Sequence, residues 1–211
     1  HDIDNLGWKL AAVITGQADP NLLESYNEER VFGADENIRN SSWTSRFMSP
    51  DSDVEMAFRN AVLGLSVNTP FARRLVNAGR LSLPCQLGHS SLTNDDKDGF
   101  DVQMTLGAPC LDAPLVSKDG ENVWLMNQLG NQFTLLVIGK PLNEVPDNMH
   151  CIHIAADGDF VDVEGMVTKR YGTGIYLIRP DQHVAARWTA DKVTNADITA
   201  AYARASAQST I

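Results

Sequence analysis

Apolar residues recur at helical spacing through the first part of the chain. A stripe at positions i, i+4, i+7 and i+8 predicts an amphipathic helix; it consists of Leu6, Leu10, Val13 and Ile14. Gly16 follows as the residue that ends this helix. Asp19-Pro20 supplies an N-cap and a proline at the first helical position, and so predicts a second, long helix from Asn21 to about Phe47. The polar face of that helix contains Gly33, where a break is compatible with the pattern.

Two shorter helical patterns follow. The turn Ser49-Pro50-Asp51 precedes a third helix, whose apolar positions are Val54, Phe58, Ala61, Val62 and Leu65. Thr69-Pro70 caps a short fourth helix that we expect to end at Gly79. Residues 80–107 have no sustained period and are rich in Gly, Ser, Asn and Asp, which indicates an extended linker and a domain boundary.

After residue 107 the pattern changes to buried strands. The apolar runs Phe133–Gly139 and Cys151–Ala156 predict two of them. Segments 174–179 and 183–188 flank the turn Pro180-Asp181-Gln182 and predict a β-hairpin. A short helix is expected over Leu125–Leu129, and a final helix over about 196–207 with its start at Thr194 or Asn195.

This order of strand, helix, strand, hairpin and helix is that of a thioredoxin-like α/β domain. The sequence thus predicts an α+β protein in three parts: an N-terminal helical segment over 1–79, a linker over 80–107, and a thioredoxin-like domain over 108–211. That domain has no C-x-x-C motif. Its first long strand is followed by Lys140-Pro141-Leu142-Asn143, so the position of the reactive thiol in such domains holds no cysteine.

Composition excludes several classes of function. The chain has 211 residues and a net charge of −10, which argues against nucleic-acid binding because phosphates require a cationic face. No stretch approaches the roughly 18 apolar residues of a membrane helix. Three widely spaced cysteines, Cys85, Cys110 and Cys151, favour a reducing cytoplasm over a disulfide framework.

The strongest motif lies at the start of the chain. It has the form Asp-x-x-Asn-Leu-x-Trp-Lys-Leu and consists of Asp2, Asn5, Leu6, Trp8, Lys9 and Leu10. Further segments follow in order: Leu22–Tyr26, Glu29-Arg30, Phe71–Asn77, Leu106–Pro109, Asp112–Leu115, Phe133–Leu136 and Tyr176–Trp188. Together they resemble flavin-dependent aromatic-ring monooxygenases of the phenol hydroxylase and para-hydroxybenzoate hydroxylase family, with bacterial 3-(3-hydroxyphenyl)propionate hydroxylase as the most similar branch.

The resemblance implies a parent enzyme in which NAD(P)H reduces FAD and a phenolic ring is then hydroxylated with oxygen. It also implies that 1–79 is the helical end of the FAD and substrate domain. The family's glycine-rich dinucleotide fingerprint would precede His1, and no G-x-G-x-x-G occurs here. We therefore expect a C-terminal fragment of a larger flavoprotein that lacks its N-terminal FAD domain. Alone it should bind no FAD, hold no catalytic residue, and serve structure and homo-oligomerisation.

Two residues are candidates for contact with the cofactor. By resemblance, Asp2 and Asn5 would lie beside the pyrimidine edge of the flavin, where a helix N-terminus stabilises negative charge on the reduced ring. The alternative is simple N-capping of the first helix by Asp2 or Asp4.

Two further patterns bear on other chemistry, metal binding and thiol catalysis. His150-Cys151-x-His153 offers at most two ligands on one face of a strand, too few for zinc. Cys110 could act as the nucleophile of a thiol peroxidase if its thiol pKa were lowered. A third alternative is a stand-alone thioredoxin-like protein-interaction module that is not part of a flavoprotein.

Overall fold

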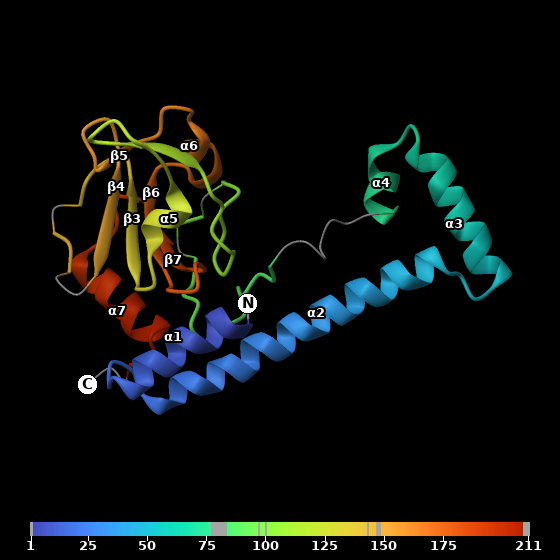
Figure 1. The fold of residues 1–211 in the computed structure, drawn as a ribbon, viewed down its shortest axis with the longest axis horizontal. Coiled ribbons are helices and arrows are strands. Elements are labelled where there is room, and N and C mark those ends of the chain that lie inside the picture. Colours follow the sequence, from blue (N-terminus) through green and yellow to red (C-terminus); the bar gives the residue numbers. More distant parts are fainter. Residues whose placement is uncertain are drawn as a thin grey trace. The chain divides into compact units, whose positions relative to one another are not determined.

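The computed structural model describes residues 2–76, 84–96, 98–99, 101–142, 144–146 and 149–208. The chain divides into two compact units, one formed by 1–29 with 86–211 and one formed by 30–85. The fold combines helices with a mixed sheet (Figure 1), so the predicted α+β class is confirmed. The boundaries predicted at 79/80 and 107/108 stay predictions.

The smaller unit is helical. It contains most of α2 (Glu24–Met48), then α3 (Asp53–Ser66) and α4 (Pro70–Val76). Helix α2 is continuous through Gly33, so the chain has no break there. Ser52 caps α3 by accepting a hydrogen bond from the backbone N–H of Glu55. The predicted end of the fourth helix, at Gly79, lies outside the described residues.

The larger unit begins with two helical pieces. Helix α1 covers Asp2–Ile14, and Gly16, with a φ of +73°, follows its end as predicted. Asp19 caps the 3-10 turn η1 (Pro20–Leu23), which leads into α2. The predicted apolar stripe is not the buried face of α1, because Ile14 is 80% exposed while Asn5 and Lys9 are buried.

In the described residues, seven strands form one sheet in the order β2-β1-β5-β4-β3-β6-β7. Their bounds are β1 Pro114–Ser117, β2 Asn122–Trp124, β3 Thr134–Ile138, β4 His150–Ile154, β5 Phe160–Val161, β6 Gly174–Ile178 and β7 Val184–Trp188. Strand β3 pairs in parallel with β4 and antiparallel with β6, which continues into the predicted hairpin with β7.

Helices cover both faces of this sheet (Figure 1). Helices α5 (Leu125–Leu129) and α6 (Met166–Tyr171) pack on one face, against side chains such as Leu136 and Ile178. Helix α7 (Asn195–Ala205), capped by Thr194 as predicted, packs on the other face with Trp8 of α1. The ring of Phe133 contacts both Trp8 and Tyr202 edge to face.

The segment that precedes the sheet, residues 86–107, is packed against the larger unit where it is described. Leu87 and Leu92 are buried, and the backbone N–H of Asn94 donates to the carbonyl of Ala185 in β7. Gly107 bonds in turn to Leu87 and to Val184, through its carbonyl and its N–H. These contacts attach residues 86–96 and 104–107 to the hairpin, while the assignment of 80–107 as a linker remains a prediction.

Candidate functional site: a buried charge network

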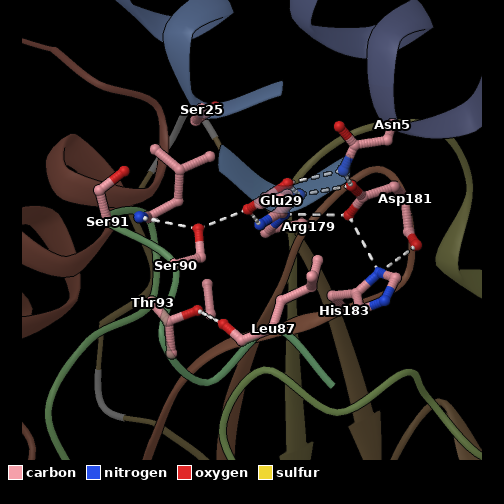
Figure 2. A network of polar contacts seen from close by, with 12 residues as sticks. Asn5, Ser25, Glu29, Leu87, Ser90, Ser91, Thr93, Arg179, Asp181 and His183 are labelled. Atoms are coloured by element: carbon pink, nitrogen blue, oxygen red, sulfur yellow. Dashed lines mark hydrogen bonds and ion pairs between the residues drawn. The ribbon is translucent and has the colours of Figure 1, made fainter. Parts of the chain in front are cut away.

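Five polar side chains meet in the interior of the larger unit, and Figure 2 labels Asn5, Glu29, Arg179 and Asp181 among them. We call this set the buried network; its members are Asn5, Lys9, Glu29, Arg179 and Asp181. Helix α1 supplies the first two, α2 supplies Glu29, and the turn between β6 and β7 supplies the last two. Lys9, Glu29 and Arg179 are at most 1% exposed. Two cations and two carboxylates thus make a network that is neutral overall.

Glu29 is the centre of the network. Its carboxylate accepts two parallel hydrogen bonds from Arg179, at 2.6 Å from Nη1 and 2.9 Å from Nη2. It also accepts from Lys9 Nζ at 2.8 Å and from Asn5 Nδ2 at 2.7 Å. The hydroxyl of Ser90 donates to the same carboxylate. A paired arginine in this fork geometry is the strongest partner available to a buried carboxylate.

Asp181 connects the hairpin turn to α1. Its Oδ2 accepts from Asn5 Nδ2 at 3.1 Å, from Trp8 Nε1 at 3.0 Å and from Arg179 Nη2 at 2.5 Å. The guanidinium of Arg179 also lies over the Trp8 ring, 5.4 Å from its centroid. The turn therefore contacts α1 in two ways. The negatively charged carboxylate of Asp181 accepts hydrogen bonds from Asn5 and Trp8, and the guanidinium of Arg179 makes a cation–π contact with Trp8.

The electrostatics agree with this geometry. Burial would raise the pKa of Glu29, but the hydrogen bonds and charge of Arg179, followed by the charge of Lys9, outweigh it and lower the pKa to about 2. Asp181 is buried as well, and Arg179 likewise holds its pKa well below the ordinary range. Burial lowers the pKa of Lys9, against the opposing effect of Glu29. Both carboxylates are thus ionised at neutral pH.

The network has the properties of a positioning device. Neither carboxylate is open to solvent, and both oxygens of each are engaged by donors within the chain. A general base needs an open path to a substrate proton, which these side chains lack. We conclude that the network holds α1, α2 and the hairpin together.

The two cofactor candidates differ in environment. Asp2 is exposed in the first turn of α1, whereas Asn5 is buried in the network. The amide of Asn5 donates to Glu29 and Asp181, and its oxygen accepts from Lys9 at 2.9 Å. Any contact of Asn5 with a flavin would therefore be made by its main chain. The role of both residues stays a prediction.

Comparison with known proteins identifies relatives of this chain. The family profile described as "FAD binding domain" matches residues 1–41, which include Asn5, Lys9 and Glu29. The chain is similar to flavin-dependent aromatic hydroxylases, the family predicted from the sequence. These relatives are enzymes, and similar solved structures contain FAD, the predicted cofactor.

Two curated relatives and one solved structure illustrate the match. The 3-(3-hydroxy-phenyl)propionate/3-hydroxycinnamic acid hydroxylase of Mycolicibacterium gilvum is 40% identical over 75 residues, covering 36% of this chain and 13% of that protein. The 12-dehydrotetracycline 5-monooxygenase/anhydrotetracycline 6-monooxygenase of Streptomyces rimosus is 29% identical over 208 residues, covering 93% and 36%. The flavin-dependent monooxygenase PieE, solved with FAD and substrate, has a similar fold, with a TM-score of 0.65, 22% identity, and coverage of 98% and 43%.

The chain spans less than half the length of each of these relatives. Arg179 and Asp181 lie outside the segment matched by the FAD-binding profile, while their partners on α1 and α2 lie inside it. The buried network therefore joins the segment matched by this profile to the hairpin of the sheet.

The first turn of α1 is the part of this chain that could lie against an edge of FAD. It is open, with Ile3 85% exposed, and the N-terminal end of a helix carries partial positive charge. The same turn carries the carboxylates of Asp2 and Asp4, so only its main chain suits an electron-rich ring edge. A phosphate-binding glycine loop does not occur in the sequence.

Thiol and metal chemistry find no support. Cys110 is buried, and burial raises the pKa of its thiol to about 12, the reverse of what a peroxidase needs. His153 Nε2 lies 2.8 Å from the carbonyl oxygen of Gly139, so this ring connects β4 to the end of β3 by a hydrogen bond. Among the described residues, no group of three or more His, Cys, Asp or Glu side chains could hold a metal ion. Nor does any described helix combine the length and apolar character needed to cross a membrane.

Proposed function

We propose that this chain is the C-terminal part of an FAD- and NAD(P)H-dependent monooxygenase that hydroxylates a phenolic ring. The observation that carries the proposal is the match of residues 1–41 to the FAD-binding profile, together with relatives that are named as aromatic hydroxylases or monooxygenases. Bound FAD would supply the redox chemistry, while the protein orients the ring and excludes water.

In this proposal the first turn of α1, through the main chain of Asp2 and Asn5, faces the pyrimidine edge of the flavin. The open first turn and the helix dipole support that placement. The chain itself is structural and supports self-association, and it does not turn over substrate alone. The missing N-terminal FAD domain and a small aromatic substrate complete the enzyme.

The sheet unit is proposed to be a thioredoxin-like domain that lacks the C-x-x-C motif of the reactive thiols. Parallel pairing of β3 with β4, the β6–β7 hairpin and the flanking helices support this assignment. The segment after β3 is Gly139-Lys140-Pro141 and holds no cysteine. The three free thiols, Cys85, Cys110 and Cys151, agree with a cytoplasmic location, which also remains a proposal.

The helical unit is proposed to be covered by the remainder of the enzyme or by a second copy. Its helices expose large apolar side chains, among them Ile38, Trp43, Met48, Val54 and Phe71. Exposed apolar residues in this number are typical of an interface.

The test is an intact mass and an absorbance spectrum of the natural product that contains this chain. We expect a polypeptide more than twice as long, with flavin bands near about 370 and 450 nm. Addition of NADH or NADPH under nitrogen should bleach those bands. A colourless product of about this chain's size would reject the proposal and favour an interaction module.

A further inference from the structure

Helix α1 is held in place by polar contacts at its N-terminal half. Its only buried residues are Asn5 and Lys9, and both belong to the buried network. A helix of 13 residues is marginal by itself, so its position depends on what it contacts. Asn5, close to its first turn, donates to both Asp181 and Glu29.

Asp181 is fixed by its own turn. The backbone N–H of Arg179 donates to the carbonyl of His183 at 2.9 Å, and that of Gln182 donates to the carbonyl of Arg179 at 2.8 Å. His183 Nδ1 lies 2.9 Å from the carbonyl oxygen of Asp181 (Figure 2). The carboxylate is thus presented to α1 from a closed hairpin turn attached to two buried strands.

Asp181 Oδ2 reaches α1 at two successive positions on one helix face. It accepts from Asn5 and from Trp8, which are three residues apart. Two acceptor contacts on one side restrict both rotation and translation of the helix. Packing of Trp8 against Phe133, at 5.5 Å between ring centroids, fixes the distance from the sheet.

We propose that the β6–β7 turn, through Asp181 with Arg179 behind it, positions the first turn of α1 and thereby the flavin that contacts it. The sheet domain then acts on the cofactor as a positioning element, through residues outside the FAD-binding segment. This inference rests on the proposed function, because it requires a flavin at residues 2–5.

The experiment uses the FAD-loaded full-length protein that contains this chain. Asp181→Ala removes the acceptor for both α1 donors, while Asp181→Asn keeps an acceptor and removes the charge. Asp191→Ala is the matched control, since this carboxylate of the same unit is exposed and pairs only with Lys140 in the described residues. The readouts are amide hydrogen exchange of residues 6–12, whose N–H groups are bonded within α1, and the dissociation constant of FAD, with exchange of β3 as the internal reference.

In Asp181→Ala we expect residues 6–12 to exchange about tenfold faster and FAD to bind about tenfold more weakly, with β3 unchanged. Asp181→Asn should lie between Asp181→Ala and the wild type, and Asp191→Ala should match the wild type. Unchanged exchange and FAD affinity in Asp181→Ala would overturn the inference while leaving the proposed function intact. A parent protein that binds no FAD would reject the proposed function itself.

A second variant covers loss of folding. If β3 of Asp181→Ala also exchanges freely, that variant is unfolded and Trp8→Phe tests the inference instead. Trp8→Phe keeps a ring against Phe133 and removes one N–H donor to Asp181. It should change exchange of residues 6–12 and FAD affinity in the same direction by a smaller factor. Wild-type values for both would overturn the inference.

Discussion

The ammonium group of Lys9 lies 2.8 Å from the carboxylate of Glu29, and neither side chain is exposed to solvent. Removal of one partner from such a buried pair leaves a charge that water cannot solvate. Lys9→Met should therefore lower the free energy of unfolding by about 3 kcal/mol. Urea unfolding followed by circular dichroism measures the change.

Lys140→Met provides the control for that loss. Lys140 forms a pair of the same length with Asp191, at 2.8 Å, but both side chains are exposed. Its removal should cost less than about 1 kcal/mol. Equal costs for the two variants would show that burial of the Lys9 pair does not determine its contribution.

The lowered pKa of Glu29 predicts a specific pH dependence. A carboxyl whose pKa falls from 4.5 in the unfolded chain to about 2 in the folded protein stabilises the fold above pH 4.5 and loses that effect as pH falls toward 2. The stability advantage of the wild type over Glu29→Gln should thus shrink by about 3 kcal/mol across this window. Urea unfolding of both proteins at several pH values measures it.

Asp181 does not confound this comparison, because its lowered pKa acts in the same direction in both proteins. Above about pH 5 the contribution of the Glu29 carboxyl to the difference between wild type and Glu29→Gln should be constant. A difference that stays the same down to pH 2 would mean that the Glu29 carboxylate is not stabilised as the structure implies.

Turn and capping residues correctly predict the β6–β7 hairpin and the start of α7. Proline and aspartate at 180–181 predicted the hairpin, and Thr194 marked the start of α7. Strands β1, β2 and β5 and the six-residue helix α6 were not predicted, because such short segments carry too little periodicity to be recognised. Their pairing is set by contacts distant in sequence.

The buried network was not predicted for a different reason. In the sequence, Lys9 and Glu29 are motif positions, and Asp181 is a turn residue within the motif segment Tyr176–Trp188. Charged side chains are rarely fully buried, so a sequence pattern assigns them to the surface. Glu29 and Arg179 are 150 positions apart, and only the folded chain brings them together. The available signal was Asn5 and Lys9 at i and i+4 on one helix face.

Burial of Cys110 predicts an unreactive thiol. With its pKa raised to about 12, only about one thiol in ten thousand is ionised at pH 8. Iodoacetamide should label Cys110 at least about a hundredfold more slowly in the folded protein than in urea. Peptide mass spectrometry measures both rates, and the half-buried Cys151 serves as the internal comparison. Rapid folded-state labelling of Cys110, or peroxide consumption that Cys110→Ser abolishes, would revive the peroxidase alternative.

Gly107 is required by the close approach of the segment before it. Its φ is +70°, and a Cβ there would lie 2.1 Å from the backbone nitrogen of Gly88 and 2.3 Å from the carbonyl carbon of Leu87. Gly107→Ala should therefore destabilise the fold by roughly 3 kcal/mol or more. Gly120→Ala is the matched control, because Gly120 has a φ of +82° with nothing within 4 Å of its Cβ position.

The control should cost only about 1 to 2 kcal/mol, the strain of a left-handed alanine. The difference between the two variants then measures the backbone contact of residues 87–88 with 107. Since Gly107 also donates to the carbonyl of Val184, loss of this contact should increase amide exchange in β7 and leave the β1–β2 turn at Gly120 unaffected. Equal destabilisation by the two alanines would mean that this close approach does not hold residues 87–88 against the hairpin.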